Sequence, residues 1–156
     1  MINIRAINNT DLEFLTKLRS NKEVRKYLGG IVSVEEIKIS FYNMLNSKNL
    51  YYIISDDNFN KIGLISLDLY HDKIHKELSY EFLPDFWNKG YAYYTLKEFL
   101  ENINSIIEID YILAETQSKN DRSVKLLEKL GFIKISTVIR FGEEQSVYKY
   151  EIEKFG

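Results

Sequence analysis

FWNKGYAYY, residues 86–94, contains one of the seven glycines of this 156-residue chain. The stretch follows a strand-like segment, LSYEFLP (78–84), and precedes apolar residues that recur at helical spacing between 93 and 103. Because glycine has no Cβ, Gly90 can adopt a left-handed conformation or let the backbone approach another group closely. A helix that begins here after a strand and a short turn leaves unpaired amides directed at one point. The stretch therefore predicts an anion-binding turn.

The composition is that of an ordinary soluble globular protein, with 45% hydrophobic and 28% charged residues. The length suits one core, so we expect a single domain over residues 1–156. The net charge of −2 gives no general attraction to nucleic acid or to an anionic membrane, and neither is expected as a partner. The absence of cysteine excludes disulfides, thiolate metal sites and a cysteine nucleophile.

The chain opens with INIRAI, a strand-like alternation that lacks the apolar core of a signal peptide. No apolar run approaches the roughly 18 residues that span a bilayer. We therefore expect a cytoplasmic protein. The sequence leaves its oligomeric state open between monomer and homodimer.

Apolar periodicity predicts eleven elements in the order β-α-α-β-β-β-α-β-α-β-β. Hairpins in the first half imply antiparallel neighbours, and crossover helices in the second half imply parallel pairing, so the sheet should be mixed. Two helices are expected to begin at capping boxes, Thr10-x-x-Glu13 and Ser33-x-x-Glu36. The expected strands cover residues 2–7, 49–55, 61–70, 76–83, 108–116, 132–140 and 145–153, and the later helices cover 90–104 and 120–130.

A second motif follows about thirty residues after the first. It consists of Asn120-x-x-Ser123 and the triplet Leu130-Gly131-Phe132. Taken alone, Asn120 is explained as a helix N-cap, Ser123 as a first-turn residue, and the Gly90 turn as a plain strand-to-helix connection.

Taken together, the two motifs resemble the GNAT superfamily of N-acetyltransferases, nearest to the branch that contains the ribosomal-protein N-terminal acetyltransferases. Val24-Arg25-Lys26-Tyr27-Leu28 and Ile62-Gly63 extend the resemblance over nearly the whole chain. It implies an α/β (α+β) fold, with a mixed, mostly antiparallel sheet of about seven strands and about four helices.

The resemblance also implies site residues, with acetyl-CoA as the co-substrate and no metal. Backbone amides of the turn would bind the pyrophosphate, with Gly90 at the closest approach. Asn120 would contact the pantetheine arm or a nearby phosphate, and Ser123 would lie near the thioester sulfur. The backbone of the preceding strand would polarise the thioester carbonyl. The implied cofactor-binding residues are Phe82, Leu83, Asn88, Lys89, Gly90, Tyr91, Ala92 and Asn120.

Three positions depart from the family pattern. Asn88 stands where this branch usually has glycine, and Asn is the next-best residue for a left-handed turn. Tyr93-Tyr94 replaces Thr-Glu, which removes a hydroxyl near the phosphate. Leu127 stands where many members carry a tyrosine general acid, so tyrosine cannot act from that position.

Attack on a thioester needs a neutral amine, and most amines are protonated near pH 7, so a base or an ordered water must accept a proton. Glu81 is the candidate base, because it lies on the strand just before the turn. The alternative is an ordinary solvent-facing strand glutamate. Strand alternation separates two faces, one with Leu78, Tyr80 and Phe82 and the other with Glu77, Ser79 and Glu81.

The two histidines, His71 and His75, fall in a predicted loop without cysteine ligands, so no metal site is expected. No Ser-His-Asp arrangement is present either, which favours direct attack by the amine over an acyl-enzyme.

The sequence therefore predicts an acetyl-CoA-dependent N-acetyltransferase that acts on a primary amine, either a protein N-terminus or a small molecule. An amino sugar, a polyamine or an aminoglycoside is the alternative acceptor. A non-catalytic CoA-binding domain is the alternative of another class. The resemblance places acceptor contacts in residues 25–45 and near Gly142, and neither segment identifies the acceptor.

Overall fold

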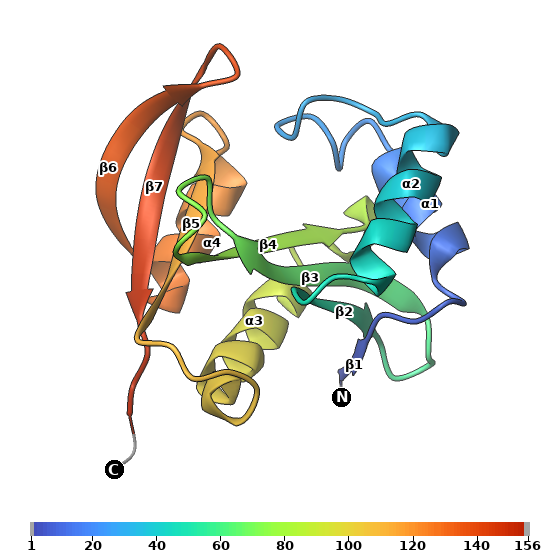
Figure 1. The fold of residues 1–156 in the computed structure, drawn as a ribbon, viewed down its shortest axis with the longest axis horizontal. Helices are drawn as coiled ribbons and strands as arrows, with labels where there is room; N and C mark the ends of the chain where they lie inside the picture. Colours follow the sequence, from blue (N-terminus) through green and yellow to red (C-terminus); the bar gives the residue numbers. More distant parts are fainter. Residues whose placement is uncertain (1, 155–156) are drawn as a thin grey trace. The chain divides into compact units, whose positions relative to one another are not determined.

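The computed structural model describes residues 2–154, and its elements follow the predicted order (Figure 1). The strands are β1 Asn3–Ala6, β2 Leu50–Ser55, β3 Lys61–Leu69, β4 Lys76–Phe82, β5 Tyr111–Gln117, β6 Ile133–Arg140 and β7 Glu143–Glu151. The helices are α1 Leu12–Arg19, α2 Val34–Leu45, α3 Tyr91–Glu101 and α4 Asp121–Leu130, with short 3-10 turns η1 Pro84–Phe86 and η2 Ile103–Ser105.

Over the described residues the strands form a seven-stranded sheet in the order β1-β2-β3-β4-β5-β7-β6. Strand β4 pairs with β5 in parallel, at Glu77 opposite Leu113. The pairs β1–β2, β2–β3, β5–β7 and β6–β7 are antiparallel. The predicted mixed, mostly antiparallel sheet is confirmed.

The chain forms two compact units. The first contains the residues up to Asp68 together with Tyr80–Lys89, and the second contains Leu69–Ser79 together with the residues from Gly90 onward. The division falls inside strand β4, which contributes residues to both units. The expectation of a single domain stays a prediction.

In the first unit, α1 and α2 pack with β2 and β3 around an apolar core. Helix α2 begins as predicted, because the Ser33 side chain accepts a hydrogen bond from the Glu36 amide at 3.2 Å. Ile37, Phe41 and Met44, which recur at helical spacing in it, are buried. The buried residues of this core are Phe14, Leu15, Leu18, Val24, Ile37, Phe41, Met44, Ile53, Leu64 and Leu83.

The predicted capping box at Thr10 is wrong. The N-cap of α1 is Asp11, whose side chain makes no cap hydrogen bond. Thr10 instead bonds to Asn8, whose side-chain oxygen accepts from the Thr10 amide at 2.9 Å and from its hydroxyl at 2.5 Å. The Thr10 hydroxyl is thus turned back towards Asn8, two residues before it in the chain.

The second unit is built on β5, β6 and β7, with α3 and α4 beside one another. The Lys129 ammonium of α4 lies 4.1 Å from the centroid of the Tyr93 ring on α3. Helix α4 ends where predicted, at Gly131, which adopts a left-handed conformation with φ of 100°. Directly after it, the ring of Phe132 packs 5.2 Å, centroid to centroid, from the Tyr150 ring of β7.

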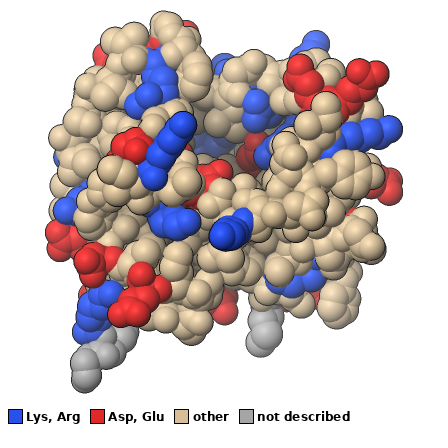
Figure 2. All heavy atoms as spheres, in the orientation of Figure 1, with Lys and Arg blue, Asp and Glu red and all other residues tan. Residues whose placement is uncertain are grey.

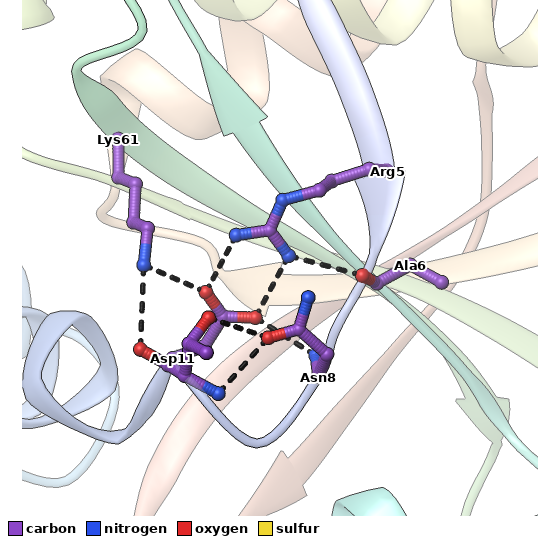
Figure 3. Close-up of polar contacts among 6 residues, drawn as sticks. Arg5, Ala6, Asn8, Asp11 and Lys61 are labelled. Atoms are coloured by element: carbon purple, nitrogen blue, oxygen red, sulfur yellow. Dashed lines mark hydrogen bonds and ion pairs between the residues drawn. The ribbon is translucent and has the colours of Figure 1, made fainter.

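The Asp11 carboxylate has no exposed surface and is surrounded by donors (Figure 3). Arg5 donates to both carboxylate oxygens, at 2.7 and 2.9 Å, and the Asn8 amide donates at 2.8 Å. The Lys61 ammonium lies 2.8 Å from Oδ1. Burial raises the pKa of Asp11, but the bonds from Arg5, Lys61 and Asn8 outweigh it and lower the pKa to about 2. The ionised carboxylate therefore ties β1 and β3 to the start of α1.

This pKa predicts an acid-dependent contribution to stability. The folded pKa lies below the ordinary value of 3.8, so the contribution is complete above about pH 4 and is lost as the pH falls towards 2. It amounts to roughly 2 kcal/mol. Asp11→Asn should lower the free energy of unfolding at pH 7, and the difference from the unsubstituted protein should shrink between pH 4 and 2. Urea titrations across this range measure it.

Asp110→Asn is the control, because Asp110 is 89% exposed and pairs only loosely with Lys154 at 3.4 Å. A slope of stability against pH that is the same for Asp11→Asn and Asp110→Asn would show that Asp11 does not carry the effect.

Candidate active site

The strand β4 leads into a tightly bonded 3-10 turn. The Phe86 amide donates to the Leu83 carbonyl at 2.9 Å, and the Trp87 amide donates to the Pro84 carbonyl at 3.0 Å. The Trp87 indole N–H donates to the Phe82 carbonyl at 2.8 Å, so the side chain folds back onto the strand. The turn is thus fixed before it reaches Asn88.

Two left-handed residues then lead the chain into helix α3. Asn88 has φ of 59°, as its residue type predicted, and Gly90 has φ of 85°. Gly90 is the N-cap of α3 and has no side chain that could accept a bond from the first helical amides. Lys89 is exposed between them, while Tyr91 and Ala92 begin the helix. A helix N-terminus that lacks a side-chain cap suits an anionic ligand.

Gly90→Val tests this turn. CoA bound at a hundredfold excess over its dissociation constant should stabilise the fold by roughly 2.7 kcal/mol. A Cβ at Gly90 would lie 3.0 Å from Cε2 of Tyr94 and would force a side chain into a left-handed conformation. We expect the variant to fold, with a reduced melting temperature, and to lose the thermal shift that CoA produces.

Gly142→Val is the matched control, because Gly142 has φ of 75° and a Cβ added there would meet no atom within 4 Å. It carries a similar backbone penalty and should keep the CoA shift. Equal CoA shifts in the two variants would remove Gly90 from the cofactor site.

The backbone of β4 divides the predicted roles of Phe82 and Leu83. The Leu83 amide donates to the Ile62 carbonyl of β3 at 2.9 Å, so it is used within the sheet. Successive amides of a strand point to opposite edges, and the Phe82 amide therefore points away from β3. Gly63 of β3 makes room for the Phe82 ring, since a Cβ there would lie 2.6 Å from Cδ1 of Phe82. Phe82 is the better placed of the two to donate to a ligand.

The Glu81 side chain is only 9% exposed and faces two arginines. Its Oε1 accepts a hydrogen bond from Arg25 Nη1 at 3.2 Å, and its Oε2 lies 3.7 Å from Arg19 Nε. Glu81 is therefore no solvent-facing strand residue. Its role as a general base stays a prediction, and the arginines are partners that the sequence did not reveal.

In the second unit, Asn120 is the N-cap of α4. Its side-chain oxygen accepts a hydrogen bond from the Ser123 amide at 3.3 Å. The structural role of Asn120 is thus confirmed, and its contact with the cofactor stays a prediction, as does that of Ser123. Leu127, one turn further on, is 1% exposed and belongs to the core.

Asn120→Ala separates the two roles. Loss of the cap alone should cost about 1 kcal/mol of stability and leave CoA affinity unchanged. A residue that also contacts the cofactor should weaken CoA binding, and this is the result we expect from calorimetric titration.

Ser33→Ala is the control, because it removes the corresponding cap from α2. Asn120 would return to a purely structural role if the two alanine variants bound CoA equally well.

A buried cluster around Glu115 was missed at the sequence level. Glu115 is 5% exposed and accepts hydrogen bonds from the Tyr70 hydroxyl at 2.6 Å and from Arg140 Nε at 2.8 Å. Burial and the bond to Glu115 raise the pKa of Tyr70 to about 12. The cluster joins β5, β6 and the β3–β4 connection. Tyr70 and Arg140 are 45 and 25 residues from Glu115 along the chain, so no local sequence pattern indicates the cluster.

Both histidines have polar partners within the second unit. His75 bonds through Nδ1 to Asp72 at 2.5 Å and through Nε2 to the Tyr111 hydroxyl. His71 Nε2 lies 3.7 Å from Glu115 Oε2. Among residues 2–154, no group of three His, Cys, Asp or Glu side chains is placed to hold a metal ion.

The surface gathers no charge of one sign in the view of Figure 2, where basic and acidic side chains are interspersed. None of the helices in the described part of the chain is long and apolar enough to cross a bilayer.

Comparison with known proteins gives consistent matches. The acetyltransferase (GNAT) domain family matches residues 2–133. The spermidine N(1)-acetyltransferase of Vibrio cholerae is 25% identical over 142 residues, which cover 85% of this chain and 79% of that protein. An uncharacterized N-acetyltransferase of Bacillus subtilis, YnaD, is 28% identical over 130 residues, or 82% of this chain and 76% of its own length.

Two solved structures share the fold. The spermidine N-acetyltransferase of Vibrio cholerae in complex with CoA and spermine superposes with a TM-score of 0.83 at 19% identity, over 97% of this chain and 95% of the other. A GNAT-family acetyltransferase of Bacillus anthracis superposes with a TM-score of 0.82 at 22% identity, over 98% of this chain and 96% of the other.

Proposed function

This chain belongs to the acetyltransferase (GNAT) family, and on that premise we propose that it transfers the acetyl group of acetyl-CoA to a primary amine of a polyamine. The family match covers residues 2–133 and makes the protein an acetyl-CoA-dependent N-acetyltransferase. This match is the observation that carries the reaction. The acceptor is the proposed part.

The relatives support a polyamine as the acceptor. The matched Vibrio cholerae enzyme is named for spermidine and covers most of this chain. The sequence favours a protein N-terminus or a small amine as the acceptor and gives a polyamine among the alternatives. The net charge of −2 is compatible with a cationic acceptor.

The residues of this chain fit direct attack. The turn Asn88–Ala92 would hold the pyrophosphate, and the Phe82 amide would donate to the thioester oxygen as negative charge develops there. Asn120 and Ser123 would lie along the pantetheine arm. The amine must lose a proton, and Glu81 is the proposed acceptor, directly or through a water. Direct proton transfer would require a carboxylate oxygen of Glu81 to exchange an arginine for the amine.

A panel of amines tests the proposal. Release of CoA thiol should depend on both acetyl-CoA and the amine, with kcat/KM for spermidine at least about tenfold higher than for N-terminal peptides, glucosamine or kanamycin, a difference of about 1.4 kcal/mol. A thiol reagent reports only CoA, because the chain has no cysteine. The Gly90→Val variant should release little thiol with any amine.

The outcomes are distinct. Faster turnover of a peptide or an amino sugar would overturn the polyamine and keep the reaction. No thiol release with any member of the panel would overturn the proposal as a whole.

A further inference from the structure

The connection between α1 and α2, residues 20–33, is built from turns and contains two adjacent glycines. Gly29 and Gly30 have φ of 90° and 85°, and no atom lies within 4 Å of a Cβ built on either. The space on the side of a Cβ is therefore open at both positions, and the hydrogen bonds of Gly30 to Arg25 hold this part of the connection. Leu28 and Ile31 lie on it and are 45% and 55% exposed.

One side chain closes this connection onto itself. Arg25 Nε donates to the Gly30 carbonyl at 2.9 Å, and Arg25 Nη2 donates to the Leu28 carbonyl at 2.5 Å. The backbone of Arg25 takes part as well, because its carbonyl accepts from the Leu28 and Gly30 amides at 3.0 and 3.1 Å. Arg25 thus bonds to the residues on both sides of Gly29.

The remaining guanidinium nitrogen fastens this turn to β4. Arg25 Nη1 donates to Glu81 Oε1 at 3.2 Å, and both side chains are largely buried, at 17% and 9% exposed. Glu81 is itself held towards Arg19, whose Nη1 donates to the Ser40 hydroxyl of α2 at 2.8 Å. A shielded ion pair of this kind is screened less than one at the surface.

The anchor point is next to the proposed chemistry. Glu81 directly precedes Phe82, whose amide is the proposed donor to the thioester carbonyl. The bond between Arg25 and Glu81 therefore fastens the connection to the strand residue that adjoins the proposed thioester site. The exposed apolar side chains there, Leu28 and Ile31, suit the methylene chain of an amine.

We propose that Arg25, anchored by Glu81, is a positioning residue that holds residues 26–32 in the conformation that binds the amine acceptor. This inference rests on the proposed function. Arg25 acts through the backbone of the connection and does not contact the reacting atoms. Loss of its bonds should therefore weaken acceptor binding and leave the cofactor site intact.

Arg25→Gln removes the three bonds. The acceptor KM should rise about tenfold or more, which corresponds to about 1.4 kcal/mol or more. The KM for acetyl-CoA should not change, and kcat should stay within a few-fold. Hydrogen exchange should accelerate in peptides that cover residues 26–32. Arg25→Lys should not restore the acceptor KM, because an ammonium cannot span three acceptors that lie in different directions.

Lys22→Gln is the matched control, since it removes one positive charge from an exposed position of the same connection. Removal of any positive charge reduces the repulsion of a cationic acceptor, and Lys22→Gln measures this general effect. The inference is overturned if Arg25→Gln and Lys22→Gln have the same acceptor KM, or if exchange over residues 26–32 is unchanged. Absence of turnover in the unsubstituted protein would instead overturn the proposed function, and exchange would still decide whether Arg25 holds the connection.

Glu81→Gln distinguishes an anchor from a general base. A base predicts a fall in kcat of roughly 10²–10⁴-fold and an unchanged acceptor KM. An anchor predicts a raised acceptor KM, and the double variant with Arg25→Gln should then raise it no further than Arg25→Gln alone. Additive effects on KM would show that Glu81 does not work through Arg25.

Discussion

A carboxylate that is withdrawn from water has to be paired, and this requirement connects separate elements of the chain. Asp11, Glu81 and Glu115 are each at most 9% exposed, and each lies against an arginine. Burial of an unpaired ion would cost several kcal/mol, so charged hydrogen bonds have to replace the lost hydration. The three pairs tie β1 to the start of α1, β4 to the α1–α2 connection, and β5 to β6.

The turn that we propose to bind the cofactor depends on a different kind of constraint. Its shape comes from backbone conformations at Asn88 and Gly90 and from a 3-10 turn that Pro84 begins. Few residue types tolerate a left-handed φ, so these positions restrict the sequence strongly. No distant side chain is needed to form the turn, although Trp87 braces it against β4.

The difference between local backbone signals and long-range ion pairs explains which features could be predicted from the sequence. The order of strands and helices, the caps at Ser33 and Asn120 and the stop at Gly131 are local signals, and the structure has them where the sequence placed them. The capping box at Thr10 failed because the Thr10 hydroxyl bonds to Asn8, and the carboxylate of the adjacent Asp11 pairs with Arg5 and Lys61 instead of capping the helix. The surroundings of Glu81 were equally hidden, since Arg25 is 56 residues away in the chain. Strand alternation gave the face of Glu81 and could not give its partners.

The same difference between local and long-range signals applies to the proposed binding sites of acetyl-CoA and of the acceptor. A turn that recognises pyrophosphate through backbone amides can be read from a few residue types at fixed spacing, and the family resemblance therefore extends to the cofactor. An acceptor segment that is held by a long-range ion pair has no such signature. In our proposal, one substitution at Arg25 or Glu81 would release this segment without changing the fold or the turn at 88–92. Identity of 25% to a spermidine acetyltransferase is thus compatible with a shared reaction, while the acceptor binding that we propose would depend on ion pairs that the sequence alone does not reveal.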